Sequence, residues 1–65
     1  MNKKYRKYAG MVVDFGVRRF TLVRIDARLT HPFICKDDGT DLEYAYRFGY
    51  DVDSGLELLK TYEVK

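Results

Sequence analysis

The chain has 65 residues, of which 46% are hydrophobic, 15% aromatic and 34% charged. A chain this apolar and aromatic is not disordered, and its length allows one domain with a small core. The single Cys excludes an intramolecular disulfide and a zinc site built on cysteines. We therefore expect residues 1–65 to form one domain.

The net charge of +2 is distributed unevenly along the chain. Residues 1–28 carry eight basic and two acidic side chains, whereas residues 29–65 carry four basic and eight acidic ones. This asymmetry favours either a basic and an acidic face that steer a charged partner, or strands whose opposite charges pair across a sheet.

Residues 1–8 form a basic segment that we expect to be a flexible N-terminal arm. No apolar stretch follows this segment, so it does not predict a secretory signal, and the apolar runs elsewhere are too short to span a bilayer. With the unpaired thiol of Cys35, these features predict a cytoplasmic protein that has no membrane partner.

Two strands are predicted in the first half of the chain. Residues 10–15 form a short apolar run that ends at Gly16. Residues 18–26 alternate with period two, and both faces carry apolar side chains, which indicates a central and bent strand.

A hairpin is predicted next. Residues 32–36 form a third strand, which begins at a Pro where a missing N–H is tolerated. Asp38-Gly39 then favours a tight turn with both residues at positive φ. Residues 42–48 alternate strictly, so that Leu42, Tyr44, Tyr46 and Phe48 share one face.

The C-terminal segment is ambiguous after a polar loop at residues 51–55. Residues 56–58 and 62–64 fit a closing strand, whereas Ser54 and Glu57 have the spacing of a helix capping box. We favour a strand or a single helical turn. This gives an all-β domain, or a mostly β domain with one short helical turn, of about five antiparallel strands.

This order of strands and turns resembles the small SH3-like β-barrels found among bacteriophage accessory proteins. The resemblance covers roughly residues 8–60 and is carried by Asp14-Phe15-Gly16, by the strand ending at Asp26, by residues 32–40 and by the aromatic strand. It implies a non-enzymatic protein that binds a protein, a nucleic acid or a small ligand. Several proteins of this kind inhibit host defence proteins, so the resemblance also implies a phage-encoded inhibitor of a host protein. Fold similarity alone does not fix the function.

Residues suited to catalysis or metal binding do not form a recognisable site. Four residues of strand separate His31 from Cys35 by about 13 Å, too far for a nucleophile and its base. Asp51, Asp53 and Glu57 lack the ligand number and spacing of a calcium loop, and no glycine-rich phosphate loop occurs. We therefore predict no enzyme, no metal and no cofactor.

The aromatic residues favour a protein partner, with a host protein as the first choice. Six tyrosines exceed what one small core buries with every hydroxyl satisfied, so some of them face outward. The predicted protein-binding residues are Tyr8, Arg47, Tyr50 and Tyr62. The ladder of Tyr44, Tyr46 and Phe48 fits either the core or a binding surface.

Two alternatives use the basic residues of the first half. A nucleic-acid-binding barrel would neutralise phosphates with cations and stack bases on tyrosines, and a homo-oligomer would hold a small anionic nucleotide between its subunits. The predicted residues for these alternatives are Lys3, Lys4, Arg6, Lys7, Arg18 and Arg19.

Overall fold

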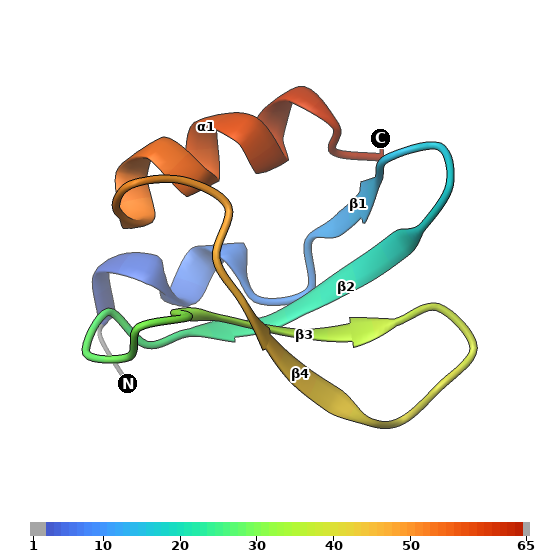
Figure 1. Ribbon diagram of the computed structural model, residues 1–65, viewed down its shortest axis with the longest axis horizontal. Helices are drawn as coiled ribbons and strands as arrows, with labels where there is room; N and C mark the ends of the chain where they lie inside the picture. The colour runs from blue at the N-terminus through green and yellow to red at the C-terminus, as the bar shows by residue number, and fades with distance from the viewer. Residues whose placement is uncertain (1–2, 65) are drawn as a thin grey trace.

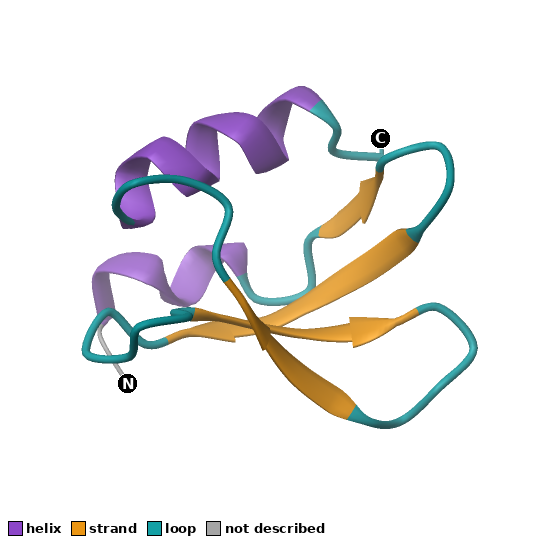
Figure 2. Cartoon of the chain, viewed as in Figure 1, coloured by secondary structure: helices purple, strands orange, loops and turns teal. Residues whose placement is uncertain are grey.

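Four consecutive β-strands form one antiparallel sheet, which one α-helix and one 3-10 helix cover (Figures 1 and 2). A computed structural model describes residues 3–64, and for Lys3 the backbone alone. The elements are the 3-10 helix η1 (Lys3–Tyr8), the strands β1 (Val12–Asp14), β2 (Arg19–Ile25), β3 (Phe33–Asp37) and β4 (Glu43–Tyr46), and the helix α1 (Val52–Thr61).

The sheet has the strand order β1-β2-β3-β4, and β2 is its longest strand. The register between β2 and β3 shifts between Leu22 and Arg24, which is the signature of a β-bulge. The bulge explains why both faces of this strand are apolar in the sequence. It turns Ile25 onto the same buried face as Phe20 and Leu22.

The core lies between the sheet and the two helices. Phe33, Leu22 and Ile25 are almost completely buried in the sheet, and Leu59 of α1 and Tyr5 of η1 pack with them. Val52, Leu56 and Leu59 recur with the helical period, so they lie on one side of α1 and are buried together.

The prediction of a strand or a single turn at the C-terminus is wrong. Residues 52–61 form a helix, which begins inside the segment predicted as a polar loop. Its N-cap is Asp51, whose carboxylate accepts a hydrogen bond of 2.8 Å from the backbone N–H of Ser54. The capping signal therefore lies three residues before the capping box considered in the sequence.

The sheet is open and has four strands where about five were predicted. After α1, Glu63 forms a single antiparallel bridge with Val13 of β1. Two backbone hydrogen bonds flank the bridge, from Asp14 N–H to Tyr62 O (3.1 Å) and from Val64 N–H to Val12 O (2.8 Å). The last described residues thus extend the sheet beyond β1 without forming a full strand.

Two local expectations also differ from the structure. The β3–β4 connection runs over residues 38–42, and Gly39 alone has a positive φ (84°), so the turn at Asp38 is not the tight type predicted. Residues 3–8 of the predicted flexible arm form η1, and Tyr5 is only 8% exposed. Residues 1 and 2 lie outside the described chain.

Candidate functional site

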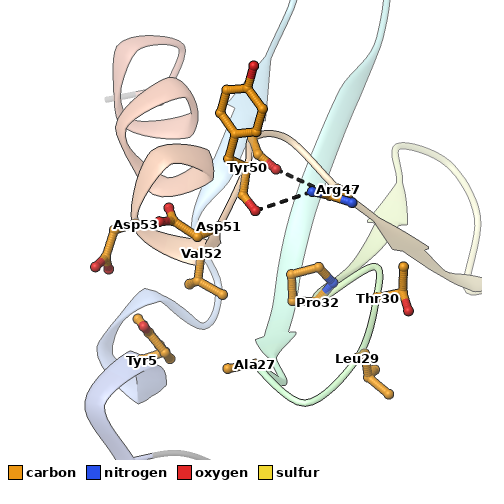
Figure 3. A pocket seen from close by; sticks show the side chains of 11 residues that line it. Tyr5, Ala27, Leu29, Thr30, Pro32, Arg47, Tyr50, Asp51, Val52 and Asp53 are labelled. Carbon is orange, nitrogen blue, oxygen red and sulfur yellow. Dashed lines mark hydrogen bonds between the residues drawn. The ribbon is translucent and has the colours of Figure 1, made fainter.

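A groove of about 460 Å³ opens where the loop before α1 faces the β2–β3 loop (Figure 3). Its floor contains the buried side chains of Tyr5, Pro32 and Val52. Tyr50 and Leu29 are exposed apolar residues at its rim. The remaining lining residues are Ala27, Thr30, Arg47, Gly49, Asp51 and Asp53.

Arg47 fixes the conformation of the loop that carries Tyr50. Its guanidinium donates one hydrogen bond from Nε to Gly49 O (3.0 Å) and another from Nη2 to Tyr50 O (3.2 Å), as Figure 3 shows. Both acceptors are backbone oxygens, so the hydrogen bonds hold the loop itself and leave the Tyr50 side chain free to contact a partner.

The loop is also fixed against α1. A Cβ atom on Gly49 would lie 2.8 Å from the backbone N of Gly55, so only glycine allows the loop to approach the first turn of the helix this closely. Directly after the loop, Asp51 caps the helix. Hydrogen bonds from Ser54 to this carboxylate, the one from its backbone N–H first, lower the pKa of Asp51.

Tyr50 is 94% exposed, although the backbone that carries it is held on both sides. Its ring points outward from the rim of the groove (Figure 3). An aromatic ring on a fixed loop loses little conformational freedom on binding and buries a large area, with a hydroxyl left for a hydrogen bond. The geometry therefore suits the recognition of a complementary surface.

Of the four residues predicted to bind protein, Arg47 and Tyr50 lie together at this groove. Tyr62 is 43% exposed and packs against Phe15, with 4.9 Å between the ring centroids. Tyr8 is half-buried at the seam between η1 and α1. The last two residues thus lie outside the groove lining.

The aromatic ladder is divided between core and surface. Tyr46 and Phe48 belong to a ring cluster in which Phe20 and Tyr46 are 4.9 Å apart and Phe33 and Phe48 are 5.2 Å apart. Tyr44, in contrast, is 46% exposed near the start of β4. Tyr46 and Phe48 therefore pack against the core, as one interpretation of the ladder predicted, whereas Tyr44 lies on the surface.

Arg18 and Arg19 form ion pairs with carboxylates of the sheet. Arg18 binds Asp37, and the Tyr46 hydroxyl donates a 2.9 Å hydrogen bond to the same carboxylate, which together lower the pKa of Asp37. Arg19 lies 3.1 Å from the carboxylate of Asp14. These ion pairs neutralise part of the positive charge with which Arg18 and Arg19 would bind an anionic ligand.

The predicted basic residues lie in two separate places. Lys4, Arg6 and Lys7 belong to η1, whereas Arg18 and Arg19 lie at the β1–β2 turn near the other end of the molecule (Figure 1). Tyr5, which lies among the first of these cations in the sequence, is buried and does not offer its ring to a base. Tyr8 remains half-exposed, with the ammonium groups of Lys7 and Lys60 5.3 and 5.4 Å from its ring centroid.

The remaining reactive residues lie outside the groove. Cys35 is 2% exposed, and burial first, then the charge of Asp37, raises the pKa of its thiol to about 12. His31 is exposed in the β2–β3 loop. Among residues 3–64, no three His, Cys, Asp or Glu side chains gather as metal ligands. No helix in this range has the length and apolar character needed to cross a membrane.

Searches of protein families, of curated proteins and of solved structures find no match to this chain.

Proposed function

We propose that this chain is a non-enzymatic binding protein that engages a protein partner through the groove rimmed by Tyr50. The observation that carries the proposal is a Tyr side chain, 94% exposed, on a loop that Arg47 and α1 hold in place. Exposed Tyr and Arg side chains at an apolar depression are the residues that dominate protein interfaces.

The chemistry of the groove favours a protein over a small substrate. Its floor is apolar at Pro32 and Val52, and its rim adds Leu29, which is 44% exposed. The lining residues include no Cys, His or Ser, and the carboxylate of Asp51 is engaged as the helix cap. An apolar side chain of the partner would fill the floor, while Tyr50 enters a depression on the partner.

The SH3-like barrel is part of this proposal. The bridge between Glu63 and Val13, with its two flanking hydrogen bonds, supports it because pairing beside β1 is the beginning of a fifth strand, the number expected for such a barrel. The resemblance to phage accessory proteins would then place the partner among bacterial host proteins, with inhibition of a defence protein as the role.

The proposal is tested by affinity capture from bacterial lysate treated with nuclease. The wild-type chain should retain a protein in stoichiometric amount, and Tyr50→Ala should weaken its binding by about thirtyfold, the effect of a residue worth about 2 kcal/mol. Val17→Ala is the matched control, because Val17 is 92% exposed in the connection between β1 and β2, which lies at the far end of the molecule (Figure 1). Equal binding by wild type and Tyr50→Ala would refute this use of the groove.

A second candidate function rests on Tyr8, whose ring centroid lies 5.3 Å from the Lys7 ammonium group and 5.4 Å from that of Lys60. Cations beside an aromatic ring suit a single-stranded nucleic acid, since the phosphates meet the lysines and a base stacks on the ring. Capture that nuclease abolishes, and that Lys7→Ala with Lys60→Ala also abolishes, would favour this function over the protein partner.

A further inference from the structure

The outer edge of β4 has no strand beside it in the part of the chain that the structure describes. β4 is the last strand of the sheet and pairs with β3 alone. Three of its four residues, Glu43, Tyr44 and Ala45, are exposed. A sheet edge presents backbone N–H and C=O groups that pair readily with another strand.

The sequence around this edge is symmetric about Ala45. Tyr44 and Tyr46 flank the alanine, an acidic Glu43 and a basic Arg47 follow on either side, and apolar Leu42 and Phe48 complete the pattern. When two copies of such a segment run antiparallel with Ala45 opposite Ala45, residue 43 faces residue 47 and residue 44 faces residue 46. Opposite charges and aromatic rings then pair across the strands.

The side chains at the edge are available for this pairing. The ion pairs among residues 3–64 are Arg18–Asp37, Arg19–Asp14 and Arg28–Asp26, so neither Glu43 nor Arg47 belongs to one. Arg47 uses two donor nitrogens on backbone oxygens, and the other N–H groups of its guanidinium remain for a carboxylate.

The same edge exposes apolar surface that a second copy would cover. Leu42 is 62% exposed and Tyr44 is 46% exposed, and they lie on the same face because they are two residues apart in the chain. The small side chain of Ala45 at the symmetry axis allows the two backbones to approach to the spacing of paired strands.

We propose that two copies of this chain form a twofold-symmetric dimer by antiparallel pairing of their β4 edges, with Ala45 at the axis. Each interface patch meets its own copy, as a twofold axis requires, and the two sheets become one continuous sheet. This dimer does not depend on the Tyr50 groove being a binding site.

A cysteine cross-link tests the register of the proposed dimer. Residues opposite each other in antiparallel strands have Cα atoms about 4.5 to 5.5 Å apart, within the range that a disulfide spans. Ala45→Cys should therefore form a covalent dimer under mild oxidation. Asp41→Cys is the control, because its two copies would lie about 26 Å apart in this register. The native Cys35 is buried and does not compete.

Charge reversal tests the pairing of Glu43 with Arg47 in solution. Sedimentation should show that wild type dimerises between roughly 1 µM and 1 mM, a range typical of weak interfaces. Glu43→Arg alone should weaken the dimer by at least about tenfold, and Glu43→Arg with Arg47→Glu should restore it, since opposite charges again face each other.

Three results would overturn the proposal. They are a wild-type chain that stays monomeric throughout this range, equal cross-linking of Ala45→Cys and Asp41→Cys, and a double reversal that stays as weak as the single one. If Arg47→Glu disturbs folding, as circular dichroism would reveal, the cross-link comparison in the otherwise wild-type chain still decides the register.

Discussion

Gly55 lies against the ring of Phe33 so closely that a Cβ atom on it would stand 2.6 Å from Cε2 of that ring. Gly55 belongs to α1, and Phe33 is the fully buried residue that begins β3. This contact sets the distance between helix and sheet. Because the helix also holds the loop that carries Tyr50, the same contact sets the position of the groove.

Replacing Gly55 by Ala should destabilise the protein. The gain in helix propensity is about 1 kcal/mol, whereas overpacking a tight core contact costs about 1 to 3 kcal/mol, so we expect a net loss. Urea unfolding measures the difference. Glu57→Ala is the control on the same helix, since Glu57 is exposed. An increase in stability for Gly55→Ala would contradict the close contact.

Because Asp51 caps α1, we expect that replacing it by Ala lowers the stability of the protein. The Asp51 carboxylate accepts from the Ser54 N–H, and removal of an N-cap costs typically about 1 kcal/mol. Asp51→Asn keeps an acceptor oxygen in place and should lose much less. Thermal unfolding followed by circular dichroism compares the two variants, and equal losses would show that the cap is not the cause.

Arg47→Lys should loosen the Tyr50 loop without unfolding the protein. A lysine ammonium has no planar fork to reach Gly49 O and Tyr50 O together, so one or both hydrogen bonds are lost. Global stability should change by about 0.5 kcal/mol or less, as for other surface sites. NMR relaxation of the Tyr50 amide should show increased motion, whereas Arg6→Lys on η1 should leave it unchanged.

Acid should destabilise the fold through carboxylates whose pKa is lowered in the native state. Hydrogen bonds from Arg28, its side chain first, lower the pKa of Asp26 to about 2, and the Tyr46 hydroxyl is the main cause of the lowered pKa of Asp37. In the unfolded chain the pKa of an Asp is about 3.9. The contribution of Asp26 is therefore complete above about pH 4 and is lost as the pH falls toward about 2, and the contribution of Asp37 is likewise lost in acid.

Substitution to Asn distinguishes the effect of Asp26 on acid stability from the effects of the other carboxylates. Asp26→Asn should flatten the dependence of the urea midpoint on pH between about 4 and about 2. Asp38→Asn is the control, because Asp38 is exposed and belongs to none of the ion pairs in the described chain. An unchanged slope in Asp26→Asn would contradict the assignment.

The strands could be predicted from the sequence because their period-two pattern is strong. All four overlap the predicted segments, with β3 ending one residue later than predicted, and the apolar residues on both faces of residues 18–26 correctly indicated a bend. The bulge that produces the bend could not be placed at Leu22 to Arg24. Its position depends on the pairing of β2 with β3, which a single strand does not reveal.

The helix was missed because its first turn is poor in helix-forming residues. Asp53, Ser54 and Gly55 all favour turns or caps in an isolated chain. In the folded protein, Gly55 is required by the close approach to Phe33, so tertiary packing outweighs local propensity. The N-terminal segment was expected to be flexible for a similar reason, as the burial of Tyr5 depends on partners distant in the chain.

The candidate site could be predicted only in part. Tyr50 and Arg47 were identified from their residue types beside a loop, and Tyr50 is exposed as expected. Leu29 and Pro32 were not, because they come from a loop that approaches Tyr50 only after the sheet and α1 have packed. Tyr8 and Tyr62 were grouped with Tyr50 by residue type, a signal that carries no information about distance.

The central claim is that Tyr50 lies in the interface with a protein partner, and photo-cross-linking from that position tests it most directly. A benzoylphenylalanine at position 50 should form a covalent adduct with the protein that the wild-type chain captures, and the same group at position 17 should not. Adducts from position 17 alone, or equal yields from both positions, would contradict the account and place the partner on another face.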